Sequence, residues 1–206
     1  MKALVVTYCP RGEQSNTKKL LDAAVAVLKA KKAVVETLDL TKDLPDLFGT
    51  EHIAAYIDRN YMGKKLSPAQ AAAMKKADRM TAQLKDADVV VLAAPMYNFS
   101  LPGAVKAWFD SVMLKGETWD FAPTGYVGLL KGKKALFLSS SGGGPYEGQI
   151  AFLEHSASLA KVNFDFMGME TETAVAPGMN RLPEKAPEIV AQGQAKARAV
   201  LEKWLA

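Results

Sequence analysis

A short polar segment near the start of the chain carries the kinds of side chain that bind anions. Arg11 supplies a fixed positive charge, and Ser15, Asn16 and Thr17 supply hydroxyl and amide groups shortly after it. The segment leads from an apolar run into a helix, so the free N–H groups of the first helical turn would also face it. The pattern predicts a phosphate site, although serine, asparagine and threonine also cap helices that bind nothing.

A second segment combines aromatic rings with an amide in a turn between an apolar run and a helix. Pro95, Met96, Tyr97, Asn98 and Phe99 follow one another without interruption. We expect a planar heterocycle to lie along this segment, with Asn98 and backbone N–H groups meeting its polar edge. The alternative buries the rings in the core, but aromatic residues bunched in a turn lack the spacing of a buried helix or strand.

A third segment places successive glycines directly after an apolar run. Ser140 and Ser141 precede Gly142 and Gly143 in it. Residues without a Cβ atom let the backbone approach a flat ligand closely and donate N–H groups to it. A flexible linker has a similar composition, but a linker does not usually begin at the end of a core strand. Together the three segments favour one ligand with a phosphate and a flat ring system, which describes a mononucleotide of flavin type.

Positioning these segments requires strands that alternate with helices, and the chain contains both kinds of pattern. The expected strands cover residues 2–8, 33–38, 88–94, 134–140 and 171–175. The expected helices cover residues 15–28, 67–84, 102–112, 150–161 and 183–205. Residues 39–67 interrupt this alternation, with only a short helix expected near 51–60. So long a connection suggests a functional or interface excursion.

The alternation predicts an α/β protein: a three-layer sandwich in which a five-stranded parallel sheet has helices on both faces. With 206 residues, the chain is expected to form a single domain over residues 1–206. Ligands of such sheets bind at the carboxyl ends of the strands, where the strand order reverses. We therefore expect the three segments, each of which follows a strand, to meet at one edge of the sheet.

Composition argues against several other classes of protein. The net charge is +4, and the lysines are scattered instead of clustered as in nucleic-acid-binding proteins. A single cysteine, Cys9, cannot form an internal disulfide, which suits a reducing, cytoplasmic environment. His52 and His155 have no cysteine or acidic cluster nearby, so no metal site is expected. No apolar run approaches the ~20 residues of a membrane span. Glycine patterns of nucleoside triphosphatases and simple nicotinamide-binding domains are also missing.

Two stretches resemble a known family. Residues 95–99, followed by Pro102 and Lys106, resemble the signature of the FMN-dependent NADH-azoreductase and NAD(P)H quinone reductase family. Residues 128–135, running into Ser140-Ser141-Gly142-Gly143, resemble it as well. The likeness covers almost the whole chain in order. It implies a flavodoxin-like fold, noncovalently bound FMN, and a homodimer with the flavin at the subunit interface.

The resemblance also implies where FMN binds. Its phosphate falls to Cys9 and the Ser15–Thr17 turn, beside Arg11, and the edge of its ring falls to the serine and glycine segment. The full set of expected cofactor-binding residues is Cys9, Arg11, Ser15, Asn16, Thr17, Pro95, Met96, Tyr97, Asn98, Phe99, Ser140, Ser141, Gly142 and Gly143. The first segment departs from the azoreductase pattern, which has serine in place of Cys9 and a longer loop. In this respect it looks more like the broader NADPH-dependent FMN reductases.

The implied activity is the reduction of quinones or azo compounds in two steps. NADH or NADPH passes a hydride to the flavin and leaves, and the acceptor then takes the same place. Tyr146, Phe121, Trp119 and Tyr126 are candidates for lining the substrate slot, with core packing as the alternative for each. No side-chain acid is expected to be indispensable. The competing hypotheses are a flavodoxin-like electron carrier and a regulatory flavoprotein, neither of which turns over a small substrate.

Overall fold

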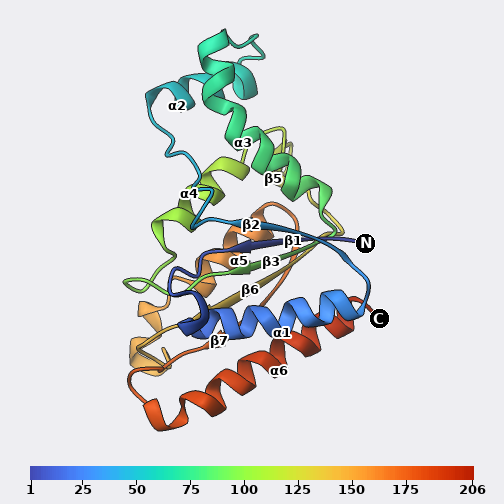
Figure 1. Ribbon diagram of the computed structural model, residues 1–206. Coiled ribbons are helices and arrows are strands. Elements are labelled where there is room, and N and C mark those ends of the chain that lie inside the picture. Colours follow the sequence, from blue (N-terminus) through green and yellow to red (C-terminus); the bar gives the residue numbers. More distant parts are fainter.

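The computed structural model describes residues 1–206 and has a five-stranded sheet at its centre (Figure 1). The strands of this sheet are β1 (Lys2–Thr7), β2 (Val34–Asp39), β3 (Val89–Ala93), β6 (Lys134–Ser140) and β7 (Glu170–Ala176). They lie in the order β2-β1-β3-β6-β7, and all neighbours are parallel. This is the order of flavodoxin-like doubly wound folds, which confirms the predicted fold class. The order reverses between β1 and β3.

Successive residues of the central strands point into two separate hydrophobic cores. In β3, Val90 and Leu92 join one core, whereas Val89 and Val91 join the other. A strand that is covered on both faces has no side that meets water. This burial explains why the sequence of β3 is apolar without interruption.

Helices form the outer two layers. Helices α1 (Asn16–Ala30) and α6 (Ala186–Trp204) cover one face of the sheet, and α3 (Pro68–Asp86), α4 (Gly103–Val112) and α5 (Ala157–Phe166) cover the other (Figure 1). Short 3₁₀ turns, η1 (Gly12–Gln14) and η4 (Pro183–Lys185), precede α1 and α6. No helix combines the length with the apolar character that a bilayer span requires.

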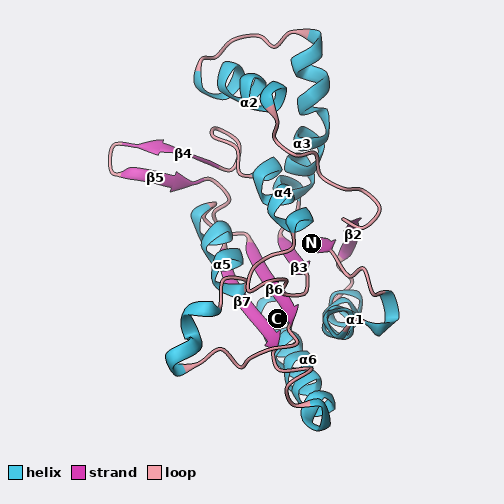
Figure 2. Cartoon of the chain, turned by 90° about the vertical axis from the view of Figure 1, so that its left-hand side faces the viewer, coloured by secondary structure: helices cyan, strands magenta, loops and turns pink.

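The excursion, residues 39–67, projects from the sheet together with one end of α3 (Figure 2). It contains α2 (Thr50–Tyr56) and a π-helical segment, η2 (Ile57–Tyr61), which confirms the short helix expected there. Asn60 Nδ2 donates to Lys115 O at 2.7 Å, and Lys115 N donates to Tyr56 Oη at 3.0 Å. These bonds tie the excursion to the loop after α4.

The structure contains a two-stranded antiparallel hairpin that the sequence analysis does not predict. It consists of β4 (Trp119–Ala122) and β5 (Gly125–Gly128) and projects from the body of the molecule (Figure 2). Each strand has four residues, too few to establish a period-2 pattern in the sequence. The hairpin is held closely against the turn after α5, because a Cβ atom on Gly128 would lie only 2.2 Å from Gly168 N.

The helix expected over residues 150–161 is wrong in its bounds. A 3₁₀ segment, η3 (Gly148–Leu153), comes first, and α5 begins only after a break at Glu154. The Glu154 carboxylate accepts hydrogen bonds of 2.7–2.9 Å from three backbone N–H groups around the start of α5. His155 N donates to Phe99 O at 2.9 Å. The break therefore both caps α5 and holds the chain against the 95–99 segment.

Candidate functional site

The anion-binding segment leads from the carboxyl end of β1 through η1 into α1. Ser15 is the N-cap of α1, and its side chain accepts a hydrogen bond from Lys18 N at 3.3 Å. The N–H groups of Asn16 and Thr17 lie in the first turn, where a helix provides no acceptor of its own. The positive end of the helix dipole lies at the same position. This turn can therefore donate to an anion.

Ser140, the last residue of β6, links the three segments physically. Its Oγ lies 2.7 Å from Thr17 Oγ1, and the two hydroxyls share a hydrogen bond. Its carbonyl oxygen accepts a hydrogen bond from Met96 N at 3.0 Å. Thr17 is fully buried, so its hydrogen bond to Ser140 holds the first segment against the third in the interior of the protein.

Cys9 and Arg11, also in the first segment, have different surroundings. Cys9 is half-buried, and burial raises the pKa of its thiol although hydrogen bonds with Thr7 and Ser15 lower it in part. The thiol is therefore neutral at pH 7 and is a poor nucleophile. Arg11 is exposed, and its guanidinium group can donate to an anion in two directions at once.

The second segment forms a tight turn with an uncommon backbone conformation. Tyr97 N donates to Ser100 O, and Ser100 N donates to Tyr97 O, both at 2.9 Å. Between them, Asn98 has φ of 47° and Phe99 has φ of 68°, which is the pattern of a type I′ turn. Asparagine tolerates this left-handed region, but for most other residues it costs roughly 1–2 kcal/mol. Backbone strain of this kind persists where neighbouring contacts fix it, and it is frequent at functional sites.

Contacts on both sides hold the strained turn in place. The Phe99 ring meets the Tyr146 ring edge-on, with their centroids 6.2 Å apart. The Tyr97 ring meets the Tyr8 ring edge-on at 6.3 Å. The N–H groups of Asn98 and Phe99 donate to no group of the chain, so both can donate to a ligand.

The glycine segment is held by its carbonyl oxygens, which leaves its N–H groups free. Gly142 O accepts from Asn180 N at 3.0 Å, and Gly143 O accepts from Gly178 N at 2.7 Å. The N–H groups of Gly142 and Gly143 donate to no group of the chain. Two fixed N–H donors of this kind can bind a carbonyl oxygen or an oxyanion.

A cleft of about 300 Å³ opens where the three segments meet. The predicted binding residues that line it are Arg11, Ser15, Asn16, Pro95, Met96, Tyr97, Ser140, Ser141 and Gly142. The predicted residues that belong to the same segments but do not line the cleft are Cys9, Thr17, Asn98, Phe99 and Gly143. Arg11 is the only charged residue of the lining, so the cleft favours an anion.

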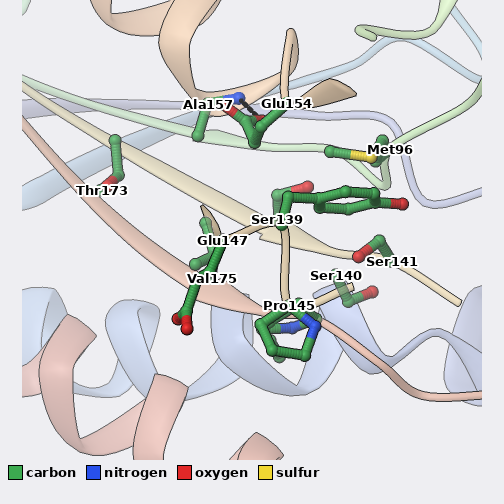
Figure 3. Close-up of a pocket in the computed structure, with 13 residues that line it drawn as sticks. Met96, Ser139, Ser140, Ser141, Pro145, Glu147, Glu154, Ala157, Thr173 and Val175 are labelled. Atoms are coloured by element: carbon green, nitrogen blue, oxygen red, sulfur yellow. Dashed lines mark hydrogen bonds between the residues drawn. The ribbon is translucent and has the colours of Figure 1, made fainter. Parts of the chain in front are cut away.

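A cavity of about 280 Å³ adjoins the cleft and shares Met96, Ser140 and Ser141 with it. At one wall of this cavity, the Glu154 carboxylate accepts the hydrogen bond of the Ala157 N–H (Figure 3). Tyr146, one of the four residues expected to contact the substrate, lines this cavity and not the cleft itself.

The other three residues expected to contact the substrate lie on the hairpin. Trp119, Phe121 and Tyr126 pack with Phe166 of α5 in one aromatic cluster, with ring centroids 5.2–5.7 Å apart. None of the three lines the cleft or the adjoining cavity. Trp119 is buried, whereas Phe121 and Tyr126 are exposed. Within one copy of the chain, the structure does not bring these rings to the cleft.

Sequence reasoning missed a fourth segment, the loop after β7. Met179 and Asn180 from this loop line the cleft, as do Pro10 and Gln14 of the first segment. A signal was available, because Pro177-Gly178 marks a turn directly after an expected strand. Like the other three segments, this loop follows the carboxyl end of a strand in the parallel sheet. No group of His, Cys, Asp or Glu side chains is arranged to hold a metal ion.

The chain has relatives among known proteins. A family model described as a flavodoxin-like fold matches residues 1–201. FMN-dependent NADH:quinone oxidoreductase 3 from Pseudomonas aeruginosa is 39% identical over 66% of this chain and 63% of its own length. An FMN-dependent NADH:quinone oxidoreductase from Shewanella loihica is 33% identical over 100% of this chain and 99% of its own. Among solved structures, an azoreductase from Bacillus anthracis is 30% identical, with a TM-score of 0.90 and 98% and 100% of the two chains covered.

Proposed function

This chain belongs to the flavodoxin-like family of its FMN-dependent NADH:quinone oxidoreductase and azoreductase relatives, and we propose that it uses FMN to reduce quinones or azo compounds with NADH. Family membership makes it an oxidoreductase. The specific proposal rests on the hydrogen-bond donors in and around the cleft. Free N–H groups from several segments surround a lining in which Arg11 is the only charged side chain.

The turn at the start of α1 fits the phosphate of FMN. Arg11 would neutralise part of its charge, and the Ser15 hydroxyl and the N–H groups of Asn16 and Thr17 would donate hydrogen bonds to it. The Thr17 hydroxyl is already bonded to Ser140 and would support the turn from behind. The neutral thiol of Cys9 adds no negative charge beside the phosphate.

The second and third segments fit the flat ring of FMN. Met96 and Tyr97 line the cleft with apolar and aromatic surface, and Pro95 keeps the segment rigid. The N–H groups of Asn98 and Phe99 would donate to the polar edge of the ring, together with the Asn98 amide. On the other side of the cleft, the free N–H groups of Gly142 and Gly143 would bind the ring's oxygen-bearing edge. Ser141 lines the cleft beside them, and its hydroxyl donates to Gly143 O, which holds the segment in place.

Bound FMN would supply the two-electron, hydride-transfer chemistry between NADH and the acceptor. The residues of the chain hold the reacting partners in place and shield them from water. Donor and acceptor would occupy the same space in turn, which is a ping-pong order. No carboxylate lines the cleft, whereas Glu147 and Glu154 line the adjoining cavity; in this proposal neither acts as an indispensable acid.

We further infer a homodimer in which the partner completes the substrate slot. Leu47 and Met62 of the excursion and Phe121 and Tyr126 of the hairpin are 53–78% exposed. Projecting apolar side chains of this kind commonly mark a protein interface. In a two-fold dimer the hairpin of one copy can approach the cleft of the other, which would bring the exposed rings of Phe121 and Tyr126 to the substrate, with the buried Trp119 packed against both.

An anaerobic absorbance experiment tests the proposed function. Purified protein is mixed with FMN, freed of unbound flavin and scanned before and after addition of NADH, and again after addition of benzoquinone. We expect bound oxidised flavin at first, bleaching with NADH, and full recovery with the quinone. NADPH in place of NADH, and an azo dye in place of the quinone, then rank the donors and acceptors.

Two outcomes would contradict the proposal. A folded protein that retains no FMN would remove the assigned chemistry altogether. A protein that retains FMN but shows no bleaching with NADH or NADPH would instead fit an electron carrier or a regulatory flavoprotein.

A further inference from the structure

The loop after β7 is fastened to the glycine segment by backbone hydrogen bonds. Gly178 N donates to Gly143 O at 2.7 Å, and Met179 N donates to Ser141 O at 3.0 Å. Asn180 N donates to Gly142 O at 3.0 Å. Three successive residues of the β7 loop thus donate to the three residues 141–143, so these bonds fix the position of the loop against the cleft.

This fastening places the Asn180 side chain directly over Gly142. A Cβ atom built on Gly142 would lie 2.6 Å from Asn180 Nδ2 and 3.1 Å from Asn180 Cγ. The φ angle of Gly142 lies outside the left-handed region, so its backbone conformation does not by itself require glycine. A side chain at residue 142 would therefore have to displace the amide of Asn180 from the place it occupies.

The amide faces the cleft and is free to bind a ligand. Asn180 lines the cleft together with Gly142, Tyr97 and Arg11, and its side-chain amide has no hydrogen-bond partner in the chain. An amide both donates and accepts but carries no charge. It therefore suits hydroxyl or ring amide groups better than a phosphate, which the cleft already meets with Arg11 and the first turn of α1.

We propose that Asn180 binds the flavin nucleotide through its ribityl chain or the polar edge of its ring, and not through its phosphate. The inference rests on the proposed function and adds a fourth segment to the flavin site. Gly142 and Asn180 then form one unit, in which the missing side chain of the first makes room for the amide of the second.

Titrations of the flavin-free protein with FMN and with riboflavin, followed by flavin fluorescence, test this assignment. Asn180→Ala should raise both dissociation constants by a similar factor, about threefold to tenfold for one lost hydrogen bond. Arg11→Ala should raise the constant for FMN much more than that for riboflavin, which has no phosphate. Gln192→Ala removes an exposed amide of α6 outside the cleft and should change neither constant.

The results separate this inference from the proposed function. Unchanged constants in Asn180→Ala, or a change for FMN alone, would overturn the inference and leave the proposed function standing. Failure of the unmodified protein to bind either flavin would overturn the proposed function, and the inference would fall with it.

A second measurement needs no flavin and tests the pairing of the two residues. Gly142→Ala should lower the urea midpoint of the otherwise unmodified protein by a small amount, because its methyl group has to displace the exposed, flexible Asn180 amide. In the Asn180→Ala background the same change should lower the midpoint little or not at all. An equal loss in both backgrounds would show that the amide does not occupy the space over Gly142.

Discussion

Asn98 and Phe99 show how single residues store strain beside a cleft. Both adopt left-handed backbone conformations, and the turn that they form is held by the hydrogen bonds between Tyr97 and Ser100. The sequence identified these residues by their chemistry but gave no sign of the backbone conformation. The strain changes which substitution tests the role of Asn98, because a branched side chain is disfavoured in this region.

Replacing Asn98 with glycine should weaken flavin binding without harming the fold. Glycine adopts φ of 47° readily, so the free energy of unfolding should change by less than about 1 kcal/mol. Loss of the amide should raise the FMN dissociation constant by about threefold to tenfold. Urea unfolding and fluorescence titration measure the two effects separately.

Asn98→Leu serves as the comparison for this variant. It removes the same amide but should also cost roughly 1 kcal/mol of stability, because leucine resists the left-handed conformation. If Asn98→Gly binds FMN as tightly as the unmodified protein does, the side-chain amide of Asn98 has no part in the site.

At the scale of elements, the excursion depends on a small set of anchoring bonds. Tyr56 Oη accepts from Lys115 N at 3.0 Å, and Lys115 Nζ donates to Asn60 O at 3.2 Å. Burial raises the pKa of Tyr56 to about 12. The bonds fix α2 and η2 to the loop that leads into the hairpin, so the two projecting elements are positioned together.

Tyr56→Phe should lower the free energy of unfolding by about 1 kcal/mol at pH 7, because Lys115 N loses its acceptor. The pH dependence should change as well. Above pH ~10 the unfolded chain releases the tyrosine proton while the folded chain keeps it, so stability falls until the pH reaches about 12. Urea unfolding between pH 9 and pH ~11 should show a steeper fall in the unmodified protein than in the variant. Parallel curves would mean that Tyr56 is not protected from ionisation by the fold.

At the scale of the whole molecule, the apolar residues that project from the sheet form the surface that the proposed homodimer would bury. In the proposed homodimer the exposed rings of the hairpin are buried between subunits. A negative charge there would have to be buried twice, once for each copy.

Phe121→Glu should therefore raise the dimer dissociation constant at least about tenfold, as measured by sedimentation velocity over a concentration series. Quinone reduction should fall with it, because the partner would no longer complete the substrate slot. Val34→Glu places the same charge at another exposed apolar position, on β2, and should leave assembly unchanged. A variant at Phe121 that sediments like the unmodified protein would argue against the hairpin as the interface.

Most of the architecture could be predicted from local sequence. The central strands are short, apolar and bounded by turn residues, and Ser15 and Ser67 cap the helices that follow them. The sequence predicts one helix over 150–161 because the apolar spacing continues through Glu154, but the Glu154 side chain accepts hydrogen bonds from the backbone and starts a new helix there. Strands of four residues, as in the hairpin, carry too little pattern to be found.

The sequence by itself determined the order of strands and helices, the three binding segments and the family to which they point, because each depends on residues close together in the chain. Only the tertiary structure decided that Thr17 and Ser140, 123 residues apart, share a hydrogen bond, and that Asn180 lies over Gly142. Such contacts depend on how helices and loops pack across the sheet. That packing brings distant residues together, and no local motif or apolar periodicity in the sequence marks such contacts.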